Sequence, residues 1–231
     1  MSIDFHDFTD TASLDAALAD FITDRLTAGL GARGRASLVV SGGRTPRGLF
    51  TRLSQADLDW SKIDITLADE RWVPPDHADS NERSVREALL IGRAAAARFL
   101  SPYDGSVTAE EGCAAWRAGL ASFARPFDVL ILGMGNDGHT ASLFPDAAEL
   151  GAGLDPANDA DCLAVHPTLA PHARISLTRR RLLDSRTLVL HVTGADKREL
   201  LDRVLAAGPV AEFPIRLALH QDDVPLHVFR T

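Results

Sequence analysis

The feature that most constrains the fold is an apolar run that ends in a glycine-rich loop, at residues 128–145. Residues 129–132 are consecutively apolar, which is typical of a strand buried on both faces of a parallel sheet. Gly133, Gly135 and Gly138 follow within six residues, and glycine lets a backbone turn sharply and approach a ligand closely. The pattern predicts a central strand with a binding site at its carboxyl end, where open α/β sheets hold ligands.

An acid and a histidine, Asp137 and His139, lie inside this loop. Histidine can act as a general base near neutral pH, and a neighbouring carboxylate can orient its ring. A lone histidine is more often structural, but this one follows a predicted central strand and stands beside an acid. The loop therefore favours a catalytic pair.

The rest of the chain alternates strand and helix patterns. Apolar residues recur at helical spacing over residues 11–30, and the glycines at 29, 31 and 34 are expected to end that helix. Other helices are expected at 46–53, 81–92, 108–123 and 195–207. Short apolar runs predict further strands at 3–8, 37–40, 63–68, 162–165, 174–177, 188–192 and 225–229. The alternation predicts a single α/β domain over residues 1–231, with a mainly parallel open sheet flanked by helices on both faces.

Two strand-to-helix junctions suit an anion. Residues 41–46 read SGGRTP, where glycines free the backbone N–H groups and Arg44 and Thr45 add side-chain donors. Lys197 lies in the first turn of another helix, where a cation opposes the helix dipole unless an anion is bound. A plain turn and a solvated lysine are the structural alternatives. The candidate phosphate ligands are Gly42, Gly43, Arg44, Thr45 and Lys197.

A third charged segment, Asp69-Glu70-Arg71-Trp72, follows the strand at 63–68. Charged groups at a strand end are costly to bury unless they have partners or a task. An Asp69–Arg71 ion pair that fixes a loop is the structural alternative to a role in binding.

Composition excludes several classes of function. The net charge of −8 disfavours binding to nucleic acid, which depends on neutralising phosphates. No apolar run is long enough to span a bilayer, and the acidic N-terminus is unlike a signal peptide, so no membrane partner is expected. Cys113 and Cys162 stand alone, which indicates a reducing cytoplasm.

Metal and cofactor motifs are weak in this sequence. The eight histidines form no HExxH motif or short ligand cluster, so no metal is expected. Residues 133–138 match the dinucleotide pattern GxGxxG, but Pro145 leaves no room for the long helix that should follow. No cofactor is expected.

Residues 41–46, 69–74 and 133–145 resemble, in order and spacing, the signature blocks of the 6-phosphogluconolactonase family. Residues 174–178 and 194–197 extend this resemblance over nearly the whole chain. It implies a Rossmann-like fold of the sugar-phosphate isomerase/CoA-transferase kind. It also implies hydrolysis of 6-phospho-D-glucono-1,5-lactone to 6-phosphogluconate in the oxidative pentose phosphate pathway, without metal or cofactor.

The resemblance also implies a role for each site residue. His139 would take a proton from the attacking water, with Asp137 orienting it. Arg71 would stabilise the developing oxyanion or bind the sugar acid, and Asp69 would hold Arg71 or a sugar hydroxyl. The phosphate would contact Gly42, Gly43, Arg44, Thr45, Arg174 and Lys197.

Two alternatives remain at this stage. Glucosamine-6-phosphate deaminases belong to the same superfamily, but they typically carry a glutamate where this chain has Phe144, and an aromatic residue in place of Arg71. A catalytically silent sugar-phosphate sensor is disfavoured by the retention of both Asp137 and His139. The expected partner is a small phosphorylated sugar lactone, and a monomer and a weak dimer both remain open.

Overall fold

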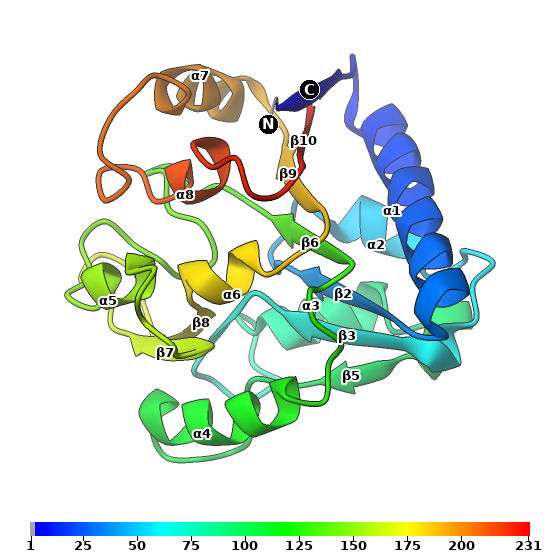
Figure 1. The fold of residues 1–231 in the computed structure, drawn as a ribbon, viewed down its shortest axis with the longest axis horizontal. Helices are drawn as coiled ribbons and strands as arrows, with labels where there is room; N and C mark the ends of the chain where they lie inside the picture. The colour runs from blue at the N-terminus through cyan, green and yellow to red at the C-terminus, as the bar shows by residue number, and fades with distance from the viewer. Residues whose placement is uncertain (1–2) are drawn as a thin grey trace.

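The computed structural model describes residues 3–231 (Figure 1). Its main feature is a parallel seven-stranded sheet in the order β1-β10-β9-β6-β2-β3-β5. The strands are β1 (Asp4–Asp7), β2 (Ala36–Val40), β3 (Ile63–Leu67), β5 (Arg98–Leu100), β6 (Val129–Leu132), β9 (Leu188–Val192) and β10 (Leu226–Arg230). The predicted parallel sheet is confirmed, whereas the short edge strand β5 was not expected.

Helices cover both faces of this sheet, as predicted. Successive side chains of a strand point to opposite faces. Val129 and Ile131 of β6 therefore pack in one core with the helices α1 (Thr11–Arg33), α2 (Arg47–Leu53) and α3 (Asn81–Ala88). Leu130 and Leu132 pack in another core with α4 (Ala109–Leu120), α7 (Ala195–Val204) and α8 (Arg216–Leu219).

A second, antiparallel sheet was not predicted. It joins β4 (Asp69–Arg71), β8 (Arg174–Leu177) and β7 (Cys162–Val165), in that order. It lies beside the short helices α5 (Leu150–Leu154) and α6 (Arg179–Leu183), as Figure 1 shows. With three charged residues, β4 has no sequence pattern typical of a strand. It forms a strand because it pairs with β8, about a hundred residues further along the chain.

The glycines near residue 30 do not end α1 together, and that prediction was wrong. Gly29 and Gly31 lie inside the helix, because a helix tolerates glycine at a modest cost. Gly34 ends it alone, with a φ of 72° and its N–H bonded to the carbonyl of Leu30. Two 3₁₀ segments complete the secondary structure, Trp60–Lys62 and Gly92–Ala96. Within residues 3–231, no helix combines the length and the apolarity needed to cross a bilayer.

The strand order reverses between β2 and β6. From β2 the chain builds outward through β3 to β5, and it then returns to β6 on the other side of β2. At such a reversal the loops after two neighbouring strands diverge to opposite faces and leave a crevice at their carboxyl ends. The loops that open this crevice are residues 41–46 and 133–145, the two segments that the sequence singled out.

Candidate active site

A cavity of about 190 Å³ lies at the carboxyl ends of β2, β3, β6 and β9. The structure brings nine of the ten predicted site residues to its wall: Gly42, Gly43, Arg44, Thr45, Asp69, Arg71, His139, Arg174 and Lys197. The tenth, Asp137, contacts the ring of His139 instead. Residues from five separate segments of the chain thus meet in one place.

His139 and Asp137 form a hydrogen-bonded pair. His139 Nδ1 lies 2.6 Å from Asp137 Oδ1, and the backbone N–H of His139 donates to the same oxygen at 3.1 Å. The ring of Phe144 packs against the imidazole, with centroids 4.1 Å apart. Partial burial of Asp137 opposes its ionisation, but the hydrogen bond and charge of His139 outweigh burial and keep the pKa of Asp137 below its usual range. The pairing at Nδ1 leaves Nε2 of His139 available to a substrate.

Gly135 makes this pairing possible. A Cβ at this position would stand 2.1 Å from His139 Nδ1 and 2.6 Å from Asp137 Oδ1. The backbone N–H of Gly135 also donates to the carbonyl of His139 at 2.8 Å, which closes the loop on itself. The glycine is therefore required by the close approach of two side chains to the backbone.

Arg71 and Arg174 stand opposite each other on the paired strands β4 and β8. Arg71 Nη1 donates to the backbone carbonyl of Asp79, and the guanidinium of Arg174 lies 5.5 Å from the centroid of Phe144. The Nε atoms of both arginines are buried and have no hydrogen-bond partner among residues 3–231. Burial lowers the pKa of Arg174, although the charge of Asp69 opposes this. Two adjacent cations with unsatisfied donors suit a negatively charged ligand.

Asp69 and Arg71 share the cavity, but each has a different partner from the one expected. Ser142 Oγ donates to Asp69 Oδ2, and Asn81 Nδ2 donates to the Asp69 carbonyl at 3.0 Å. The neighbouring Glu70 accepts the backbone N–H of Asn81 at 2.8 Å and anchors the start of α3. Burial raises the pKa of Glu70 to about 7, although the hydrogen bonds that it accepts from backbone N–H groups act to lower this pKa. Glu70 is thus a structural acid, and Asp69 is the acid of the cavity.

Lys197 reaches the cavity from the first turn of α7. Its Nζ donates to the carbonyl of Met134 at 2.7 Å. This bond holds the ammonium group at the cavity wall, against the loop after β6. Burial lowers the pKa of Lys197, and the charge of Asp137 opposes that shift. Arg44 and Thr45 stand exposed at the cavity mouth on the loop after β2. Cationic and hydroxyl donors therefore line the same cavity as His139.

Comparison with known proteins places this chain in a family. The sequence profile described as glucosamine-6-phosphate isomerases/6-phosphogluconolactonase matches residues 9–226. The chain belongs to this family. A 6-phosphogluconolactonase of Rhizobium meliloti (strain 1021) is 44% identical over 229 residues, which are 99% of each chain.

Solved structures agree with this membership. A crystal structure of a 6-phosphogluconolactonase from Shewanella baltica OS155 aligns with a TM-score of 0.97 at 46% identity, covering 99% of this chain and 97% of that one. A monomeric glucosamine-6-phosphate deaminase aligns with a TM-score of 0.80, covering 98% of this chain and 97% of that one. At 17% identity, this second alignment shows the shared fold alone.

Three residues of this family member's site were missed by the sequence analysis: Asn81, Ser142 and His191. His191 is buried at the end of β9 and lines the cavity, with its Nε2 3.6 Å from Asp15 Oδ1. Both of its ring nitrogens lack a hydrogen-bond partner in the described part of the chain, and burial lowers its pKa to about 4. The sequence signal for His191 was that it is the single polar residue in the otherwise apolar strand at 188–192.

Proposed function

We propose that the protein is a 6-phosphogluconolactonase, which hydrolyses 6-phospho-D-glucono-1,5-lactone to 6-phosphogluconate in the oxidative pentose phosphate pathway. The observation that carries this proposal is the Asp137–His139 pair at a cavity whose wall also presents Arg44, Arg71 and Lys197. A substrate with a phosphate at one end and an electrophilic carbonyl at the other matches both parts of the site. Full-length relatives with this activity in their names support the same assignment.

The chemistry follows from the orientation of His139. With Nδ1 hydrogen bonded to Asp137, Nε2 takes a proton from water as the water oxygen attacks the lactone carbonyl carbon. The positive charge that forms on the imidazole is stabilised by the ionised Asp137. When the tetrahedral intermediate collapses, the ring oxygen leaves and takes the proton back from Nε2.

Arg71 is suited to the charge that forms on the carbonyl oxygen. Arg71 stands at the cavity wall with a buried, unpaired Nε, and Arg174 lies beside it on the paired strand. A preorganised donor aimed at a developing oxyanion commonly contributes about 10²- to 10³-fold in kcat. We assign the oxyanion to Arg71 and the binding of a sugar hydroxyl to Asp69.

The phosphate is assigned to the loop after β2 and to two further cations, Lys197 and Arg174. Gly42, Gly43, Arg44 and Thr45 on the loop after β2, together with Lys197 and Arg174, supply N–H, hydroxyl and cationic donors on one cavity. Phosphate binding fixes the lactone so that its carbonyl meets His139, which lowers the entropic part of the barrier. The proposed chemistry needs no metal or cofactor, and the two free cysteines suit a cytoplasmic enzyme.

The test is hydrolysis of enzymatically generated 6-phosphogluconolactone, measured above the spontaneous rate. His139→Gln is expected to keep the fold and to lower the catalysed rate by about 10²- to 10⁴-fold, because an amide cannot accept the proton of water. His220→Gln, an exposed histidine outside the cavity, is the matched control and should keep wild-type activity. A wild-type rate in His139→Gln would exclude the general-base role. Ammonia release from glucosamine 6-phosphate at a comparable rate would favour a deaminase instead.

A further inference from the structure

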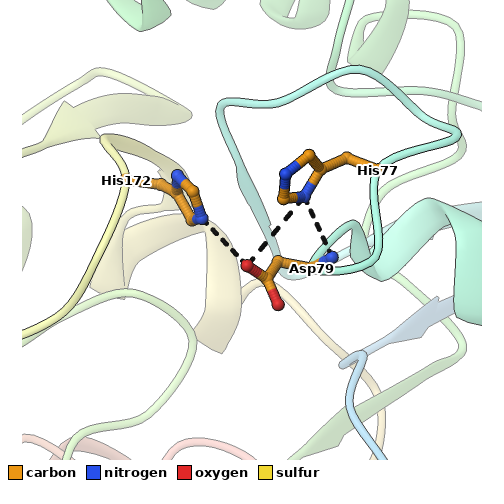
Figure 2. A group of neighbouring side chains, drawn as sticks. All are labelled: His77, Asp79 and His172. Carbon is orange, nitrogen blue, oxygen red and sulfur yellow. Dashed lines mark hydrogen bonds and ion pairs between the residues drawn. The ribbon is translucent and has the colours of Figure 1, made fainter.

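Three side chains outside the cavity converge on one point, as Figure 2 shows: His77, Asp79 and His172. One donor atom from each lies within 4.8 Å of the other two. His172 Nε2 is 3.0 Å from Asp79 Oδ2, and His77 Nδ1 is 3.9 Å from the same oxygen. Two imidazole nitrogens and one carboxylate oxygen are a donor set that Zn²⁺ accepts, with water at the fourth position.

We propose that His77, Asp79 and His172 form a binding site for a divalent transition-metal ion of the zinc class, separate from the cavity. Donors about 2.0–2.2 Å from a tetrahedral ion stand roughly 3.3 Å from one another. The two separations to Asp79 Oδ2, 3.0 and 3.9 Å, lie on either side of that value. His77 and Asp79 are exposed, so small rotations of their side chains bring all three donors into range.

Before an ion binds here, His77 Nδ1 must release the N–H group that it accepts and His172 Nε2 must give up a proton. The backbone N–H of Asp79 donates to His77 Nδ1 at 3.1 Å, so this nitrogen carries a lone pair. His172 Nε2 shares a proton with Asp79 Oδ2, and an ion bound between them replaces that proton. The displaced proton moves to Nδ1 of His172 or to solvent, because a metal binds the neutral imidazole through a lone pair.

An ion at this site would join two loops that border the cavity. Asp79 holds Arg71 through its backbone carbonyl, and His172 precedes Arg174 by two positions. These arginines lie on β4 and β8, which are paired with Arg71 opposite Arg174. Coordination of Asp79 and His172 by one ion therefore restrains both loops at their open ends. We expect bound Zn²⁺ to stabilise the fold and to reduce motion of the two arginines.

The test is Zn²⁺ binding to untagged, EDTA-treated protein, measured by calorimetry, with Co²⁺ absorption as a report on the ligands. Wild type should bind one ion per chain at this site. Affinity should fall by about tenfold or more in His77→Ala, Asp79→Asn and His172→Asn, each of which removes or weakens one ligand. Asparagine is chosen for position 172 because it tolerates the φ of 68° found there. Zn²⁺ at about a hundredfold above its Kd should raise Tm by about 5–10 °C.

His166→Ala is the matched control. Its two acidic neighbours, Glu149 and Glu110, face opposite nitrogens of its ring, so the three groups do not converge on one point. This variant should bind Zn²⁺ like wild type. Failure of wild type to bind Zn²⁺ at millimolar concentration would overturn the proposal. Binding that is undiminished in all three ligand variants, or binding lost in His166→Ala, would overturn it equally.

Discussion

Gly135 shows how one missing side chain sets the geometry of the proposed catalytic pair. A Cβ would overlap both His139 Nδ1 and Asp137 Oδ1, so Gly135→Ala must displace one or both side chains. Because misplacement of a catalytic group by about 1 Å can cost roughly a hundredfold, we expect kcat/KM to fall by about ten- to a hundredfold. Steady-state kinetics and the Tm of the same sample separate this effect from unfolding. Gly151→Ala, where a Cβ meets nothing within 4 Å, should keep wild-type kinetics, and equal kinetics in both variants would contradict the prediction.

His191 predicts a pH dependence of stability. Burial lowers its pKa from 6.5 to about 4 in the folded protein. Across this window the unfolded chain binds a proton that the folded chain does not, so the free energy of unfolding falls as pH falls. A shift of this size corresponds to roughly 3 kcal/mol between pH 6.5 and 4.

His191→Gln should remove this contribution, because a neutral amide does not titrate. Denaturant unfolding at about pH 7, 5.5 and 4.5 measures the difference in slope between the variant and wild type. The exposed His220→Gln is the control and should keep the wild-type slope. A His191→Gln variant that loses stability with acid as steeply as wild type would show that His191 is protonated in the folded state.

At the scale of elements, α1 offers a prediction from its two internal glycines. Gly31 has open space where a Cβ would stand, whereas a Cβ at Gly29 would lie 3.0 Å from Asp128 Oδ1 and 2.9 Å from Arg33 Nη2. Alanine is the better helix former by about 1 kcal/mol. Gly31→Ala should therefore raise the free energy of unfolding by about 0.5–1 kcal/mol. Gly29→Ala should gain less or nothing, and urea titrations that give equal gains would contradict the role of crowding.

The second sheet shows how an element can position chemistry without resembling a regular strand. β4 has three residues, yet its pairing with β8 sets Arg71 directly opposite Arg174. Its middle residue, Glu70, turns inward to accept the N–H groups at the start of α3. The strand therefore presents charged side chains to the cavity on one side and fixes a helix on the other.

At the scale of the whole molecule, we propose that residues 1–231 form a single domain. Ile175 and Leu177 of the small sheet are fully buried in the same core as Leu130 and Leu132 of the main sheet. Because one core joins both sheets, thermal unfolding is expected to show one transition by circular dichroism and fluorescence.

Phosphate should stabilise this domain by mass action, because we propose that it binds the folded chain at the cavity. Inorganic phosphate at about a hundred times its Kd adds roughly 2.7 kcal/mol, or about 5–10 °C in Tm for a chain of this size. Lys197→Ala should lose most of this shift. Lys62→Ala, which removes an exposed lysine paired with Asp59, is the control and should keep it. A full phosphate shift in Lys197→Ala would place the phosphate elsewhere.

The sequence by itself determined the elements whose signals are local. The apolar run at 129–132, the glycines that follow it and the helical pattern from residue 108 each act within a few residues. The structure has a strand, a tight loop and a capped helix at these places. The resemblance of three loops to a known family supplied the expected reaction. Both kinds of signal survive without tertiary contacts, because turn chemistry and side-chain periodicity are properties of short segments.

The tertiary structure alone decided which distant residues meet. It paired Asp69 with Ser142, set Arg71 against Arg174, and brought His172 to Asp79 across 93 residues of chain. None of these contacts has a local pattern, since each joins two segments that lie far apart in the chain. Their free energy comes from packing the whole core, and for that reason no short stretch of the sequence contains them.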